Sequence, residues 1–150
     1  MPTPSPRRSE DLMHLLTRAE RLAARLLQSA LEEHGCTLDA WRVLSLLSDG
    51  EGHPMTAVAE EAFLPPATLT KLVDHLVDQN LVHRRVDPLD RRRILAHLTP
   101  RGETYWRRVD REVRTRWPAL SGGEGDEELL RGLLLRLVDE LDGAAAQSSV

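Results

Sequence analysis

The sequence predicts a mainly α-helical protein with one small β-hairpin, and three observations support this fold class. Aliphatic residues recur every three or four positions through most of the chain, which is the period of a helix with one buried face. That period changes to short alternating runs between residues 81 and 99, and "HPMTAVAEEAFL" also offers a short extended piece before the third helix. The composition is 41% hydrophobic but only 3% aromatic, so the core must consist of Leu, Val and Ala, which favours helices.

A chain of 150 residues is expected to form one domain that needs no metal or disulfide to fold. Its single cysteine, Cys36, fits a reducing compartment. The N-terminal residues contain no long apolar run, so we expect no signal peptide. No apolar stretch approaches the roughly 18 residues that a membrane span requires. These features predict a cytoplasmic protein without membrane contact.

The N-terminal half is predicted to contain four helices. Residues 1–9 are rich in Pro and Ser and are expected to form a disordered arm. A long amphipathic helix should follow from Asp11 to about Glu33, and its six turns of apolar stripe suggest packing against more than its own domain. The expected helix boundaries are Ser9 as N-cap and Gly35 as stop for the first helix, Thr37 and Thr56 as N-caps of the second and third, and Pro66 at the first position of the fourth.

The second half begins with the hairpin. The fourth helix should end at Asn80, and "LVHRRV" and "RILAHLT" read as two strands joined by "DPLDRR". Thr99 and Pro100 should cap and open a fifth helix that runs to about Trp117. A sixth helix is expected over residues 126–142, followed by a flexible tail at 143–150.

Charge is concentrated at the tip of this hairpin. The chain has a formal net charge of −4, yet five arginines lie within residues 84–93. A local field of this kind, more than total charge, decides which partner a surface attracts. Two closely spaced helices followed by a two-stranded ribbon with a basic tip is the layout of a winged helix-turn-helix. In that layout the thin ribbon can enter a groove of nucleic acid.

The stretch "DPLDRRRILAHLTPRG" resembles the wing signature of the MarR family (multiple antibiotic resistance regulators). The matching residues are Asp90 and Arg92, then Leu98-Thr99, then Gly102. Upstream, "TLTKLVDHLVDQNLVHRR" looks like that family's recognition helix running into its first wing strand, and "TLDAWRVLSLL" is similar to its second helix. The likeness runs from about residue 10 to 142 and keeps the order of elements.

This resemblance implies a homodimeric, sequence-specific DNA-binding transcription regulator, a repressor relieved by a small-molecule effector. Residues 10–35 and 100–142 would form the helical dimerisation region, and residues 36–99 the DNA-binding lobe. The partner would be double-stranded DNA carrying a pseudo-palindromic operator. The recognition helix would enter the major groove, and the wing an adjacent minor groove with Arg92 inserted and Asp90 holding its guanidinium.

The residues themselves support such contacts. Arginine suits a narrow minor groove because its guanidinium is weakly hydrated and the groove potential is negative. Asp74 either opposes DNA or pairs with a nearby arginine. The expected DNA contacts are Ala67, Thr68, Thr70 and Lys71 on the recognition helix, Arg84 and Arg91 toward phosphates, and Asp90 with Arg92 at the wing tip.

A second candidate site is an effector pocket formed by Trp41, Trp106, Arg42 and His14, which would take a small aromatic or anionic molecule. The alternative is that the tryptophans belong to the core or to a dimer interface. Cys36 is a candidate oxidant sensor or, alternatively, a small apolar residue at a helix junction. The histidines lack metal-ligand spacing, so we expect no metal or cofactor.

Two residues depart from the family pattern. Phe63 occupies the turn between the two helices of the motif, where the family usually has a small residue, and Pro65 replaces the usual Ser before the recognition helix. With the net acidity, they leave open an alternative: a winged-helix dimer that binds proteins and not DNA. An enzyme is not expected, because the sequence has no phosphate-binding loop and no nucleophile elbow.

Overall fold

The computed structural model describes residues 11–148. By its internal contacts the chain divides into two compact units, residues 1–117 and 118–150, and each is described by itself. The first unit contains all but one of the helices and strands found in the described residues. In chain order they are α1 (Leu12–Glu32), α2 (Leu38–Leu46), β1 (His53–Pro54), α3 (Met55–Glu61), α4 (Pro66–Asp78), β2 (Val82–Val86), β3 (Ile94–Leu98) and α5 (Pro100–Arg116), and the second unit holds α6 (Glu124–Ser148).

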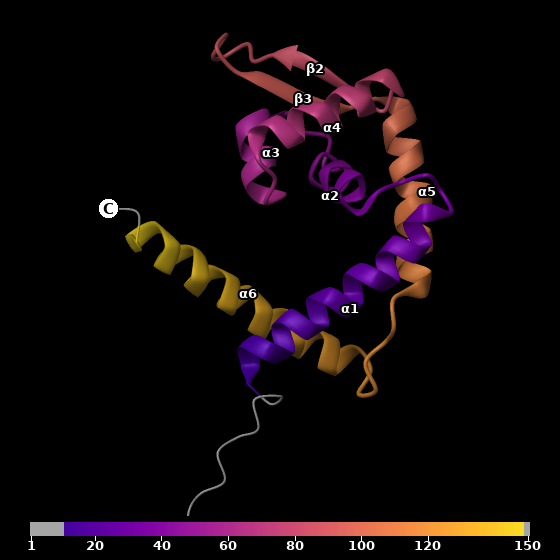
Figure 1. The fold of residues 1–150 in the computed structure, drawn as a ribbon, viewed down its shortest axis with the longest axis vertical. Coiled ribbons are helices and arrows are strands. Elements are labelled where there is room, and N and C mark those ends of the chain that lie inside the picture. The colour runs from indigo at the N-terminus through magenta and orange to yellow at the C-terminus, as the bar shows by residue number, and fades with distance from the viewer. Residues whose placement is uncertain (1–10, 149–150) are drawn as a thin grey trace, which may run out of the picture. The chain divides into compact units, whose positions relative to one another are not determined.

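The three strands form one small antiparallel sheet in the order β1-β3-β2. In the hairpin, Arg84 lies opposite Ala96 and His83 opposite His97. The short β1 strand pairs with the other edge of β3, placing His53 opposite Ala96. Figure 1 shows the hairpin extending past the helices, with α4 running beside it. The mainly helical fold with a β-hairpin wing is therefore confirmed.

An aliphatic core holds the first unit together, as the composition predicted. The C-terminal end of α1, the inner faces of α2, α3 and α4, the strands and α5 all contribute to it. Leu44, Leu47 and Val73 are fully buried at its centre. At about 25 cal/mol per Å² of apolar area removed from water, such side chains supply most of the stabilisation of a helical lobe.

Three helices end with the same backbone motif. Gly35 after α1, Phe63 after α3 and Asn80 after α4 all have positive φ, at 64°, 53° and 57°. The amide after each bonds to the carbonyl five residues earlier, with distances of 3.1 Å for Cys36 to Leu31, 3.0 Å for Leu64 to Ala59 and 2.9 Å for Leu81 to Leu76. The ends at Gly35 and Asn80 confirm the sequence prediction, since Gly and Asn adopt this conformation most readily.

Two of the predicted N-caps are confirmed. The Thr37 hydroxyl accepts a hydrogen bond from the Ala40 amide at 3.1 Å, and the Thr99 hydroxyl accepts one from the Gly102 amide at 2.9 Å. Each satisfies one of the amides that the first helical turn leaves without a partner.

Two other helix starts differ from the prediction. The N-cap of α1 is Asp11, whose carboxylate accepts from the Met13 amide at 3.4 Å, whereas Ser9 and the predicted arm at 1–9 lie outside the described residues. Thr56 does not cap α3, which begins one residue earlier at Met55 without a side-chain cap. The reason is tertiary: Pro54 is still paired with β3, so the chain turns directly from the strand into the helix.

In the second unit α6 is longer than predicted. It begins at Glu124 and continues to Ser148, so residues 143–148, expected as a flexible tail, are helical. The run of three alanines after Gly143 explains this, because Ala has the highest helix propensity and no proline follows. None of the helices in residues 11–148 is long and apolar enough to span a membrane.

Candidate nucleic-acid interface

Two aspartates order the tip of the wing. The carboxylate of Asp87 accepts a hydrogen bond from the Leu89 amide at 2.8 Å, and that of Asp90 accepts one from the Arg92 amide at 3.1 Å. Backbone bonds of 2.9 Å from Asp87 to Arg93 and from Arg93 to Asp90 close the loop. Asp87 is 7% exposed, so it is a buried structural group of the turn. The tip is therefore a loop whose backbone is held by hydrogen bonds.

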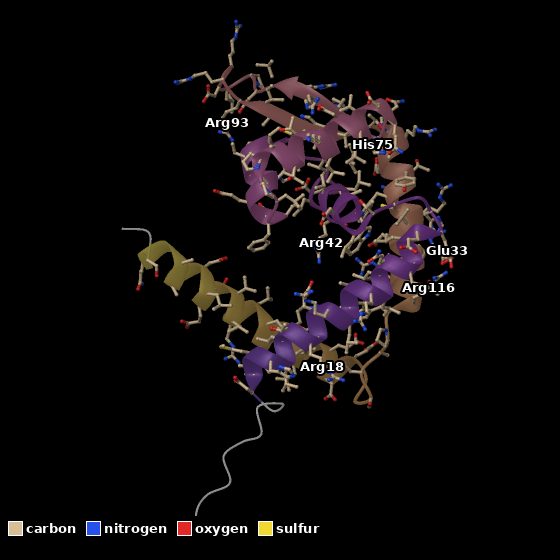
Figure 2. All side chains as sticks on the ribbon, in the orientation of Figure 1. Arg18, Glu33, Arg42, His75, Arg93 and Arg116 are labelled. Carbon is tan, nitrogen blue, oxygen red and sulfur yellow. The ribbon has the colours of Figure 1, made fainter. Side chains whose placement is uncertain are left out.

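The arginines at this tip project into solvent. The side chain of Arg92 is 94% exposed, and its Nε lies 3.4 Å from the Asp90 carboxylate, which is the pairing that the sequence predicted. Arg93 lies 3.8 Å from Asp87, and Arg91 is also exposed. Figure 2 shows Arg93 at the free end of the hairpin. Because Arg91 and Arg92 are solvated, they can meet a negative surface without first breaking buried contacts.

The outer face of α4 carries the predicted contact residues. Leu69, Val73 and Leu76 face the core. On the other side Ala67, Thr68, Thr70 and Lys71 are all exposed. The Thr70 hydroxyl donates to the Pro66 carbonyl at 2.9 Å, so toward solvent it offers its methyl group and its acceptor lone pairs. Small and hydroxylated side chains of this kind allow a helix to approach base edges closely.

The start of α4 has no side-chain cap, because Pro65 occupies the N-cap position and Pro66 the first helical position. Free amides at the start of a helix, together with the positive end of its dipole, favour an anion there. The Ser hydroxyl that the family often places at this point would satisfy one of those amides internally. In this chain they remain open to solvent.

Arg84, predicted from the sequence to lie toward phosphates, is engaged in an ion pair. Its guanidinium donates to the Asp74 carboxylate, across from β2 to α4. Of the two predictions for Asp74, pairing with an arginine is therefore the one found. The pair cancels a positive charge on the basic face, and it also links the recognition helix to the root of the wing.

A groove of about 490 Å³ joins these parts. It brings together Thr70, Arg84 and Arg92 of the predicted contact set, with Asp74. The rest of its lining was not predicted from the sequence: Pro54, Met55, Thr56, Arg93 and Ile94. No local signal could have placed Met55 or Thr56 there, since their position depends on the pairing of β1 with β3.

A second pocket, of about 560 Å³, contains part of the predicted effector site. Trp41 and Arg42 line it, and Trp106 is adjacent because its indole NH donates to the Ser45 hydroxyl of the pocket wall at 3.0 Å. His14 is not a lining residue of this pocket. It lies six positions before the lining residue Glu20, which is about 9 Å away along the helix axis. The remaining lining residues are Leu46, Glu61, Ala62 and Phe63.

Charged and polar groups in this pocket are only loosely paired. The Arg42 guanidinium lies 3.6 Å from Glu20 and 3.7 Å from Asp39, outside ordinary hydrogen-bond distance. The indole NH of Trp41 is buried and has no hydrogen-bond partner among the described residues. An unsatisfied buried donor of this kind costs folding free energy.

Cys36 behaves as a structural residue. It is 5% exposed, and burial raises the pKa of its thiol, which disfavours the reactive thiolate. Burial likewise raises the pKa of Tyr105, whose hydroxyl donates to the His34 carbonyl at 3.1 Å. Residues 11–148 contain no group of three or more potential metal ligands.

A winged helix-turn-helix with an aliphatic core and arginines on its wing is typical of a class of DNA-binding regulators. Comparison with known proteins identifies the family within that class. The MarR family model matches residues 34–93, and the regulator FarR of Neisseria gonorrhoeae is 30% identical over 111 residues, covering 74% of this chain and 75% of FarR. The chain belongs to the MarR family, whose members are non-enzymatic DNA-binding transcription regulators.

Solved structures of similar proteins agree with this assignment. NadR, in complex with 4-hydroxyphenylacetate, is 25% identical with a TM-score of 0.72 over 95% of this chain and 98% of NadR. CouR from Rhodococcus jostii RHA1, bound to p-coumaroyl-CoA, is 26% identical with a TM-score of 0.75 over 89% of this chain and 95% of CouR. A putative regulator of the hcr operon in Thauera aromatica is 28% identical over 71% of this chain. The match covers 63% of that relative, slightly less than two thirds of its length.

Proposed function

We propose that this protein is a cytoplasmic homodimeric repressor that binds a pseudo-palindromic operator and is released from it by a small aromatic, anionic effector. The observation that carries the DNA-binding part is the continuous face formed by the exposed flank of α4 and the ordered arginine tip of the wing. One groove joins the two elements. A helix and a ribbon held side by side can read adjacent major and minor grooves.

On this face each residue has a distinct role. Ala67, Thr68 and Lys71 meet bases and phosphates in the major groove, and Arg92 enters the minor groove with Asp90 behind it. Arg91 adds a phosphate contact, which supplies affinity without sequence information. Thr70 offers its methyl group to thymine, and the Arg84–Asp74 pair sets the angle between α4 and the wing.

Two helices with solvent-exposed apolar faces support the proposed homodimer. In α1, which is 21 residues long, only Ala30 and Leu31 are buried, and α6 has no buried residue in its 25-residue length. A second copy of the chain would cover these faces, as helices cover one another in bundles. The exposed residues concerned are Leu12, Met13, Leu15 and Leu22 on α1 and Leu129, Leu130, Leu133, Leu134, Leu135, Val138 and Leu141 on α6.

The effector site is proposed for the pocket that contains Trp41 and Arg42. Its volume of about 560 Å³ is within the usual range for small-molecule sites. The ligands of NadR and CouR, 4-hydroxyphenylacetate and p-coumaroyl-CoA, both combine an aromatic ring with negative charge. Such a molecule would stack on Trp41 and place its anionic group at Arg42.

A salt series tests DNA binding directly. DNA fragments are first selected with the purified full-length protein, and the affinity for the best duplex is then measured by fluorescence anisotropy from 50 to 300 mM KCl. We expect the logarithm of the affinity to fall linearly with log salt, by about 0.9 per neutralised phosphate. A flat response, or no selected sequence, would instead favour the protein-interaction alternative.

A further inference from the structure

Phe63 is the one phenylalanine of the chain, and its placement is unusual. It is 90% exposed and has a φ of 53°, in the turn between α3 and α4. The equivalent positions after α1 and α4 hold Gly35 and Asn80, with the same hydrogen-bond pattern. The same backbone motif therefore occurs three times, and only here does it carry a residue that disfavours the left-handed conformation.

In the described residues, no packing of the Phe63 side chain offsets the backbone strain at this position. A bulky side chain at positive φ is strained, and a ring that is 90% exposed contributes almost no apolar burial to folding. Local strain that the fold does not need is a reason to look for a functional role. Contacts that the ring makes in another state of the protein would supply such a role.

The surroundings of Phe63 indicate that state. Phe63 lines the 560 Å³ pocket together with Trp41, so aromatic residues from two different elements, α2 and the α3–α4 turn, border it. The Arg42 guanidinium in the same pocket is paired only loosely, at 3.6 Å from the Glu20 carboxylate. Figure 2 shows Arg42 extending from α2 into the space between α2 and α1.

We propose that Phe63 couples effector binding to the recognition helix. A planar aromatic carboxylate stacks between Trp41 and Phe63 with its carboxylate at Arg42, and the Phe63 ring turns inward to cover it. This inference rests on the proposed effector function and names how that site regulates DNA binding. The ligand holds a different position of the turn from the one in the free protein, which is the differential contact that an allosteric change requires.

The connection to α4 is short and stiff. Only Leu64 and Pro65 separate Phe63 from Pro66, the first residue of α4. Each proline fixes its own φ, and a residue before proline is restricted as well, so little of a movement at Phe63 can be absorbed within the linker. A displaced turn therefore tilts the start of the recognition helix.

The test compares the ratio of operator dissociation constants with and without effector, so that any change in basal affinity divides out. The probes are 4-hydroxyphenylacetate and a set of substituted benzoates and cinnamates, each at saturating concentration. The variants are Phe63→Gly and Phe63→Asn, which remove the ring and tolerate positive φ, and Phe63→Tyr, which keeps it. Asn80→Gly is the matched control, since it changes the same backbone motif away from the pocket.

We expect the effector to weaken operator binding about 10-fold in the wild type, in Phe63→Tyr and in Asn80→Gly, and less than about 2-fold in the two variants without a ring. An equal response in all variants would overturn the role of Phe63 and leave the effector function standing. No response of the wild type to any probe would overturn both. If light scattering showed that loss of the ring weakens the dimer, Phe63 would be a subunit contact and the inference would be wrong.

Discussion

At the residue scale, the arginines of the wing have different tasks. Arg92 is almost fully exposed and is held at its base by Asp90, whereas Arg84 is paired with Asp74 on the recognition helix. Both side chains belong to the same basic stretch, but Arg92 is 94% exposed in the loop, whereas Arg84 in β2 is only 29% exposed. Arg92 is therefore available to a partner, whereas Arg84 links strand β2 to helix α4.

The exposed arginine gives the first prediction. Arg92→Ala should weaken operator binding about 10-fold or more and leave the melting temperature unchanged, because its side chain is 94% exposed. Anisotropy titrations and thermal melts measure the two effects. Arg111→Ala, which removes an exposed arginine from α5, is the control and should leave operator binding unchanged. Equal losses in both variants would mean that only total charge matters.

The ion pair between Arg84 and Asp74 gives the second prediction. Asp74→Asn removes a negative charge from the basic face and frees Arg84, so affinity for unrelated DNA should rise several-fold and its salt dependence should steepen. Asp78→Asn, one turn further along the same exposed face, controls for the change in net charge. If both substitutions act alike, the ion pair has no specific role.

At the element scale, a pair of stacked histidines lies on the two strands of the wing. The rings of His83 and His97 lie 5.1 Å apart and 5° from parallel on adjacent strands. The Nε2 atom of His83 is buried without a partner among the described residues. Burial lowers the pKa of His83, and the neighbouring positive charges of Arg85 and His97 lower it further.

This lowered pKa has a definite sign for stability. As the pH falls, the unfolded chain takes up a proton at His83 near pH 6.5, before the folded protein does. The stability that the folded protein gains from neutral His83 is therefore complete above that pH and is lost as the pH falls. We expect the drop in melting temperature between pH 7.5 and 5.5 to be smaller in His83→Phe than in the wild type. His75→Phe, at an exposed site on α4, should keep the full drop.

The junction between β3 and α5 is closely packed around Gly102. A methyl group at this position would lie 1.9 Å from the Leu81 carbonyl oxygen, which itself accepts a bond from the Thr99 amide at 3.0 Å. Gly102→Ala should therefore lower the free energy of unfolding by about 3 kcal/mol or more, measured by urea denaturation. Gly132→Ala on α6, where nothing lies within 4 Å, should instead be neutral or stabilising by up to about 1 kcal/mol.

At the scale of the whole molecule, the helices with uncovered apolar faces determine the proposed assembly. Leu134→Asp should raise the dimer dissociation constant about 100-fold, because a carboxylate would be placed in an apolar interface. Sedimentation equilibrium measures this. Arg136→Asp introduces the same side chain at a polar position of α6 and should have a much smaller effect. A wild-type protein that remains monomeric at micromolar concentration would contradict the proposed assembly.

Much of the fold was predictable because its signals are local. The helical periods, the caps at Thr37 and Thr99, the left-handed end at Asn80 and the hairpin each follow from residues within a few positions of one another. The extent of α6 was not predicted correctly, since its alanine-rich end has helix propensity but lacks an apolar stripe. The start of α3 was missed because it depends on a strand pairing across some 40 residues.

The sequence by itself determined the class of protein, the position of the wing and the basic residues at its tip, since these depend on spacing along the chain. Only the tertiary structure decided that Arg84 pairs with Asp74, that Thr56 lines a groove with the wing, and that Phe63 shares a pocket with Trp41. Such contacts join residues far apart in sequence. Packing selects them, and no short pattern of residues records which side chains it brings together.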